Sequence, residues 1–168
     1  MDLDLTRQQD RIKYLVTQGS KYIITPLRLS NHETGASAVV NAVWDTGATR
    51  SAVSPNMADY LNLEKRGGGF TTGIGGKVGV WLALALAFPG NADWYTIANP
   101  IVAQLPASID FLIGLDIIML GDFSLKHGDN GTLLEFVFDQ EYFVNINTDS
   151  VKTAMEKISR ANDRLKSF

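Results

Sequence analysis

The most informative stretch of this chain is AVVNAVWDTGATRS, residues 38–51. Its apolar first half predicts a strand that ends at Trp44. The next residues are Asp45, Thr46 and Gly47, a carboxylate followed by a hydroxyl and a glycine. Glycine lets backbone approach closely, and the threonine hydroxyl can hydrogen-bond across a tight site. This order is typical of a catalytic loop, although a turn residue after a strand is the simpler interpretation of Asp45 taken alone.

Two later segments add to this motif. Residues 72–80, TGIGGKVGV, form a glycine-rich turn that leads into an apolar strand. Residues 111–116, FLIGLD, place apolar residues and Gly114 just before a short apolar helix expected over 115–120. Each segment alone is a modest signal, but the order and spacing of the three are fairly specific.

In this order the three segments resemble the retropepsin-like aspartic proteases, over residues 21 to 138. The sequence Gly114-Leu115-Asp116 of the later loop looks more like the cellular and bacterial members than the retroviral ones, and the chain departs from the viral pattern with neutral residues at Thr49 and Leu115. Viral members usually carry charges at these two positions. The resemblance implies a mainly β fold, a closed β-barrel with short helices. The many short apolar runs separated by turn signals also predict a mainly β domain.

The resemblance makes Asp45 the catalytic residue of an aspartic endopeptidase. Such an enzyme needs two carboxylates that share one proton and activate a water. The chain has one DTG sequence, so we expect a homodimer in which Asp45 of each subunit meets at the two-fold axis. Asp110 and Asp116 lie outside such a sequence and are interpreted as loop or helix-start carboxylates.

The resemblance also implies roles for the neighbours of Asp45. Thr46 would pair with its symmetry mate beneath the two aspartates, and Gly47 would accept substrate backbone. The glycine-rich turn would be a mobile flap over the cleft, with Ile74 at its tip, and Leu112 would line an apolar substrate pocket. The implied substrate-binding residues are Ala48, Thr49, Gly73, Ile74, Gly75, Gly76 and Leu112.

Composition excludes several other kinds of chemistry. There is no cysteine, which rules out thiolate nucleophiles and cysteine metal sites, and neither histidine has metal-ligand spacing. The net charge of −3 gives no electrostatic footprint for nucleic acid, and the longest apolar run, 78–88, is too short to span a bilayer. We therefore expect no cofactor, metal, nucleic acid or membrane partner, and a cytoplasmic location.

Three regions are expected along the chain. Leu5, Ile12, Leu15 and Val16 have roughly helical spacing, which predicts an N-terminal helical extension over 1–20. Residues 21–147 would form the retropepsin-like domain. Residues 148–168 would form an amphipathic C-terminal helix capped by Ser150.

Two other functions are kept as alternatives. The fold could serve as a non-catalytic module for dimerisation or peptide binding. More remotely, residues 45–51 resemble the phosphate-binding hairpin of actin-like ATPases, but that fold needs two lobes and far more chain. Peptide cleavage separates the first alternative from a protease, and nucleotide binding tests the second.

Overall fold

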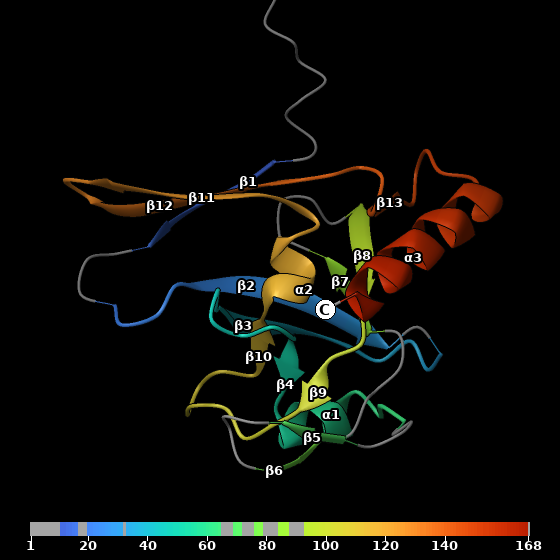
Figure 1. Ribbon diagram of the computed structural model, residues 1–168, viewed down its shortest axis with the longest axis horizontal. Helices are drawn as coiled ribbons and strands as arrows, with labels where there is room; N and C mark the ends of the chain where they lie inside the picture. Colours follow the sequence, from blue (N-terminus) through green and yellow to red (C-terminus); the bar gives the residue numbers. More distant parts are fainter. Residues whose placement is uncertain are drawn as a thin grey trace, which may run out of the picture.

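The computed structural model describes residues 11–16, 20–31, 33–64, 69–71, 76–78, 84–87 and 93–167. The elements are β1 (Arg11–Val16), β2 (Ile24–Asn31), β3 (Ser37–Trp44), β4 (Ala52–Val53), α1 (Pro55–Tyr60), β5 (Gly69–Thr71), β6 (Gly76–Val78), β7 (Leu84–Ala87), β8 (Trp94–Ala98), β9 (Ile101–Val102), β10 (Phe111–Ile113), α2 (Leu115–Ile118), β11 (Gly121–Gly128), β12 (Gly131–Phe138), β13 (Val144–Asn145) and α3 (Val151–Lys166) (Figure 1). Strands dominate this list, which confirms the prediction of a mainly β fold.

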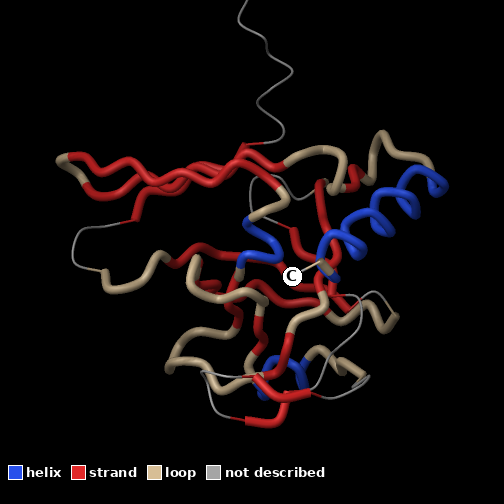
Figure 2. The backbone as a smooth tube through the Cα atoms, in the orientation of Figure 1, coloured by secondary structure: helices blue, strands red, loops and turns tan. Residues whose placement is uncertain are grey.

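The strands form one large sheet and two smaller ones. The eight-stranded sheet has the order β13-β8-β7-β2-β3-β10-β4-β9, and the three-stranded sheet has the order β1-β12-β11. Among the described strands, the large sheet runs from β13 at one end of this order to β9 at the other. Within the described part of the chain, the strands β5 and β6 form a separate two-stranded sheet, and Figure 2 draws this pair at the end of the molecule that carries α1.

The helix expected at the N-terminus is wrong for Arg11–Val16, because these residues form β1. They pair antiparallel with β12, from Arg11 opposite Val137 to Val16 opposite Thr132. Ile12 is buried while its neighbours Arg11 and Lys13 are exposed, which is the alternation of a strand. Instead of an extension ahead of the domain, this segment is part of the three-stranded sheet.

Serine side chains cap the helices at the middle and the end of the chain. The side chain of Ser54 accepts a hydrogen bond from Met57 N at the start of α1, and Pro55 occupies the first turn. The side chain of Ser150 accepts from Thr153 N at the start of α3. The predicted C-terminal helix is therefore confirmed, and it packs along β8 and β13 (Figure 1).

The core lies between the three-stranded sheet and the large sheet. Phe136 and Phe138 of β12 point into it, and the ring of Phe136 contacts that of Trp44 at a centroid distance of 5.3 Å. A second apolar cluster lies under the end of β3 and contains Val43, Ala52, Ile101, Ile109 and Leu112. These two clusters fix the end of β3 from both sides. Asp45 is the next residue after this strand.

Candidate active site

Three neighbouring strands place Asp45. β10 lies between β3, with which it is parallel, and β4, with which it is antiparallel. The connection from β3 to β4, residues 45–51, therefore passes over the carboxyl end of β10. The Asp45 N–H donates to Ile113 O at 3.0 Å, and Leu115 N donates to Ala48 O at 2.8 Å. These two bonds join the Asp45 loop to the loop at Gly114, so two segments far apart in sequence form one unit.

The residue before Asp45 is held firmly. The Trp44 indole donates from Nε1 to Thr25 Oγ1 at 2.9 Å, and both residues are buried. Its ring stacks on Phe123 of β11 with a centroid distance of 5.3 Å. Because Trp44 is fixed by a hydrogen bond and by aromatic contacts, the backbone of Asp45 starts from a well-defined position.

The Asp45 carboxylate is half-buried and keeps one oxygen available. Gly47 N donates to its Oδ1 at 2.8 Å, which closes a tight turn. Within the described part of the chain, Oδ2 has no hydrogen-bond partner. Thr46 and Gly47 are exposed beside it. The geometry leaves a carboxylate oxygen free to accept a hydrogen bond from a water or a substrate.

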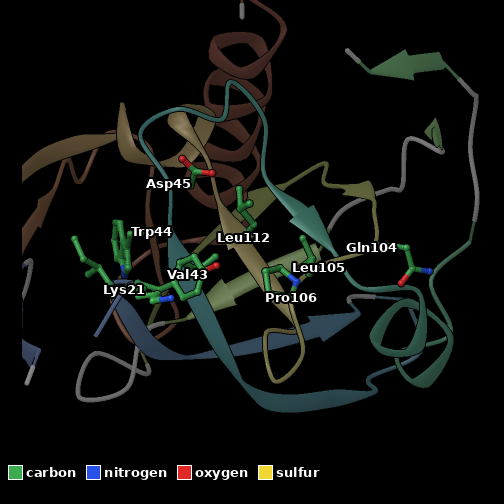
Figure 3. A pocket seen from close by; sticks show the side chains of 10 residues that line it. Lys21, Val43, Trp44, Asp45, Gln104, Leu105, Pro106 and Leu112 are labelled. Atoms are coloured by element: carbon green, nitrogen blue, oxygen red, sulfur yellow. The ribbon is translucent and has the colours of Figure 1, made fainter. Parts of the chain in front are cut away.

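A cavity of about 680 Å³ opens next to this carboxylate (Figure 3). Asp45 and Leu112 both line it, and most of its wall is apolar. The polar lining comes from Asp45, Lys21 and Gln104. The remaining lining residues are Tyr22, Ile23, Val43, Trp44, Leu105 and Pro106. A cavity of this size, with an apolar wall and a few polar groups, is typical of a ligand-binding site.

Other predicted site residues lie in different places. Ala48 packs against the second apolar cluster, whereas Thr49 is exposed. Gly76 is the first residue of β6 and lies opposite Thr71 of β5, so the glycine-rich turn joins two antiparallel strands as expected of a hairpin. Gly73, Ile74 and Gly75 fall outside the described residues.

Ser51 and Asp116 form a buried polar pair behind the loop, and no sequence pattern predicted this contact. Asp116 is 2% exposed, at the start of α2 as expected, and its Oδ1 accepts from Ser51 Oγ at 2.6 Å. Ser51 N donates to Oδ1 at 3.0 Å and to Oδ2 at 2.9 Å, and Ile117 N donates to Oδ1 at 3.0 Å. Burial raises the pKa of Asp116, although the bonds from Ser51 and Ile117 and the charge of Arg50 act against this rise. The partners are 65 residues apart, which is why no local pattern points to them.

The described residues offer no other kind of centre. Within those ranges, no group of three or more histidine or carboxylate side chains is close enough to hold a metal ion. In the same part of the chain, no helix is long and apolar enough to cross a membrane.

Comparison with known proteins gave matches among solved structures only; no family model and no curated protein sequence matches the chain. The chain is structurally similar to retropepsin-like aspartic proteases. One is the retropepsin-like aspartic protease of Rickettsia conorii, with a TM-score of 0.49 and 12% identity over 80% of this chain and 92% of that chain. Another is the retroviral protease-like domain of Ddi1 from Leishmania major, with a TM-score of 0.48 and 22% identity over 72% and 94%. A third is EIAV protease complexed with the inhibitor HBY-793, with a TM-score of 0.44 and 19% identity over 62% and 92%.

Proposed function

We propose that this chain is an aspartic endopeptidase that acts as a homodimer, with Asp45 of each subunit activating a water for peptide-bond hydrolysis. The observation that carries the proposal is the position of Asp45. Its half-buried carboxylate lies at the junction of two parallel strands, beside an apolar cavity of about 680 Å³. A peptide side chain in that cavity would bring the adjacent peptide bond next to the carboxylate.

We infer that the second carboxylate comes from another copy of the chain, since neither Asp110 nor Asp116 can supply it. Asp116 is buried and its oxygens are taken by Ser51 and Ile117, so it cannot meet a substrate water. Asp110 directly precedes β10 and so lies at the start of that strand. Asp45 lies at the other end of β10, where Ile113 O accepts a hydrogen bond from Asp45 N. Neither residue can therefore pair with Asp45, whereas a symmetry mate can.

The surface around Asp45 has the features of a contact between two copies. Thr46 and Gly47 are exposed at the tip of the loop. β11 lies close by, since its Phe123 stacks on Trp44, and within the described sheet it has a strand partner on one side only. An unpaired strand edge is a template for pairing with another strand, so two copies of β11 could pair across the two-fold axis.

In the dimer, one Asp45 acts as general base on a water and the other as general acid on the carbonyl oxygen of the substrate. Thr46 would pair with its mate under the two carboxylates, and Gly47 would accept substrate backbone. The hairpin of β5 and β6, with Gly73, Ile74, Gly75 and Gly76, would close over the peptide. Ala48, Thr49 and Leu112 would contact its side chains.

Cleavage of a diverse peptide library tests this function. We expect Asp45→Asn to abolish cleavage, because the only catalytic carboxylate of each subunit is lost. Asp110→Asn is the matched control, since it makes the same chemical change on a neighbouring loop and should retain cleavage. Robust cleavage by the Asp45 variant would contradict the assignment, and a folded dimer of the parent protein without cleavage would favour the non-catalytic alternative.

Subunit mixing tests the dimer separately. When equal amounts of parent and Asp45→Asn chains are exchanged at random, about a quarter of the dimers carry two intact aspartates. If both carboxylates are needed, exchange halves the activity of the freshly mixed sample, to about a quarter of the activity of parent protein at the same total concentration. Activity that stays at its level before exchange, about half of that of parent protein at the same total concentration, would show that each subunit works alone.

A further inference from the structure

The loop that carries Asp45 is held from behind by a set of polar contacts that reach the C-terminal helix. The first contacts involve Ser51, whose Oγ donates to Asp116 Oδ1 at 2.6 Å and accepts from Gly114 N at 3.0 Å. These bonds tie the end of the Asp45 loop to the Gly114 loop. The two loops therefore move together, and whatever fixes one of them fixes the other.

Arg50 extends these contacts away from the active site. It precedes Ser51, is half-buried, and donates from Nη2 to Asn99 O at 2.9 Å. Its charge also lies near Asp116, where it offsets part of the cost of burying that carboxylate. Arg50 is thus held between the buried acid and the connection from β8 to β9.

Asn99 then contacts the C-terminal helix. Its Nδ2 donates to Asn162 Oδ1 of α3 at 3.3 Å, and both residues are half-buried. The chain of contacts runs from Asn162 through Asn99 and Arg50 to the Asp45 loop. In Figure 1 the C-terminal end of α3 lies beside α2, the helix that begins with Leu115 and Asp116.

The position of α3 is fixed by other interactions, so Asn162 is a firm point of attachment. Lys157 pairs with Asp149 at 2.9 Å, and these side chains are only 15% and 13% exposed. Lys157 Nζ also lies 5.5 Å from the centre of the Trp94 ring. Arg160 pairs with Glu141 at 3.2 Å at the surface.

We infer that α3 is a positioning element for the catalytic loop and that Arg50 is the positioning residue through which it acts. The inference rests on the proposed protease function. Loss of the contact between Asn162 and Asn99 would loosen Arg50 and allow the Asp45 loop to shift, although no residue that touches substrate is changed. Turnover then depends on how well α3 is docked, because small displacements of a catalytic group are costly.

The test compares Asn162→Ala with Asp163→Ala in the full-length protein. Asp163 is next to Asn162 on the same helix, but its side chain is 68% exposed and pairs only with Lys166 among the described residues. We expect Asn162→Ala to lower kcat by roughly 2- to 30-fold with KM little changed, the range typical of residues that couple to a site without touching its ligand. Asp163→Ala should keep the parent kcat.

Arg50→Gln should lower kcat at least as much as Asn162→Ala. The double variant should then be no worse than Arg50→Gln alone, because both changes break one chain of contacts. If the fold-losses in kcat of the two single variants multiply in the double variant, the inference is overturned. An Asn162→Ala variant with the parent kcat would overturn it as well.

Hydrogen exchange gives a readout that does not depend on catalysis. Asn162→Ala should speed exchange of the Ser51 and Gly114 amides, while Asp163→Ala should not. Unchanged exchange would overturn the inference even if the protein is a protease. If exchange changes as expected but the parent cleaves no peptide, the coupling stands and the proposed function fails.

Discussion

Gly114→Ala is expected to separate the two loops that form the candidate active site. The backbone of Gly114 is extended, with φ −93° and ψ −176°, so the constraint on this residue is space and not conformation. A Cβ atom there would lie 2.6 Å from Arg50 C, 2.7 Å from Arg50 O and 2.9 Å from Ser51 N. All three are backbone atoms, which cannot rotate away.

The size of the disturbance follows from these distances. Ordinary contact begins at 3.4 Å, so the Arg50 backbone must move by about 0.8 Å, the difference from 2.6 Å. Overpacking of this kind costs about 1–3 kcal/mol, and weakening the bond from Gly114 N to Ser51 Oγ adds about 1 kcal/mol. At about 2–4 °C per kcal/mol for a chain of this length, we expect the Tm to fall by roughly 4–16 °C.

The effect on catalysis should be larger than the effect on stability explains. A displacement near 1 Å of a catalytic group costs about 10²-fold in rate, so kcat per folded molecule should fall by roughly 10- to 100-fold. The assay is peptide cleavage well below the Tm of each variant, with the folded fraction measured by circular dichroism. The Tm arm of the experiment does not depend on the proposed function.

Two glycines of another element, Gly121 and Gly128 of β11, provide the controls. A Cβ at Gly121 would overlap the Val137 carbonyl oxygen and lie 2.7 Å from Phe138 Cα, whereas at Gly128 its nearest neighbour would be Gly131 O at 3.8 Å. Gly121→Ala should therefore lose stability but keep kcat per folded dimer, and Gly128→Ala should change neither. The reasoning fails if Gly114→Ala matches the parent protein in Tm and kcat, or if Gly121→Ala loses as much kcat as Gly114→Ala.

Two further predictions concern the buried carboxylates. Asp116→Asn should lower the free energy of unfolding at pH 7 by about 1–3 kcal/mol. Ser51 N, a donor 2.9 Å from Oδ2, would then face the new NH₂ group, which is also a donor, and would lose its acceptor. Urea unfolding of the parent and the variant measures the difference. Although burial favours the neutral acid, the bonds from Asn145 N and Lys157 hold the pKa of Asp149 below its ordinary value of 3.8. The charged Asp149 therefore stabilises the fold above pH 3.8, and this contribution is lost as the pH falls through the lower pKa of the folded state. Between about pH 4 and 2, the free energy of unfolding should fall more steeply for the parent than for Asp149→Asn. Equal slopes of this free energy against pH would refute the prediction.

The sequence predicted the elements whose signals are local. The strand before Asp45 and the cap at Ser150 both depend on residues close together in the chain. The N-terminal segment misled because Ile12, Leu15 and Val16 also fit a helical spacing. Its pairing with β12, more than a hundred residues later, decides its structure, and tertiary pairing of that kind overrides a weak periodicity.

The candidate site also combines residues that a local sequence pattern predicted with residues that no such pattern indicates. Asp45 was predicted from a short motif, and Leu112 was predicted as part of an apolar wall; the two line one cavity. The rest of that wall comes from residues 21–23 and 104–106, which carry no motif and meet only in the folded chain. The bond between Ser51 and Asp116 was missed for the same reason, since a serine after a turn and an acid in the first turn of a short helix are ordinary residues until they meet.

The two sides of the Asp45 loop differ in how well their polar groups are satisfied. On the inner side, Ser51, Gly114 and Asp116 use their donors and acceptors on one another, away from water. On the outer side, Thr46 and Gly47 are exposed, and Oδ2 of Asp45 has no partner among the described residues. A loop that is rigid behind and open in front is suited to meet a second copy of itself, because its geometry is fixed before the partner arrives and little conformational freedom is lost on assembly. Under the proposed function, the contacts behind the loop and their connection to α3 would therefore contribute to catalysis by fixing the position of Asp45.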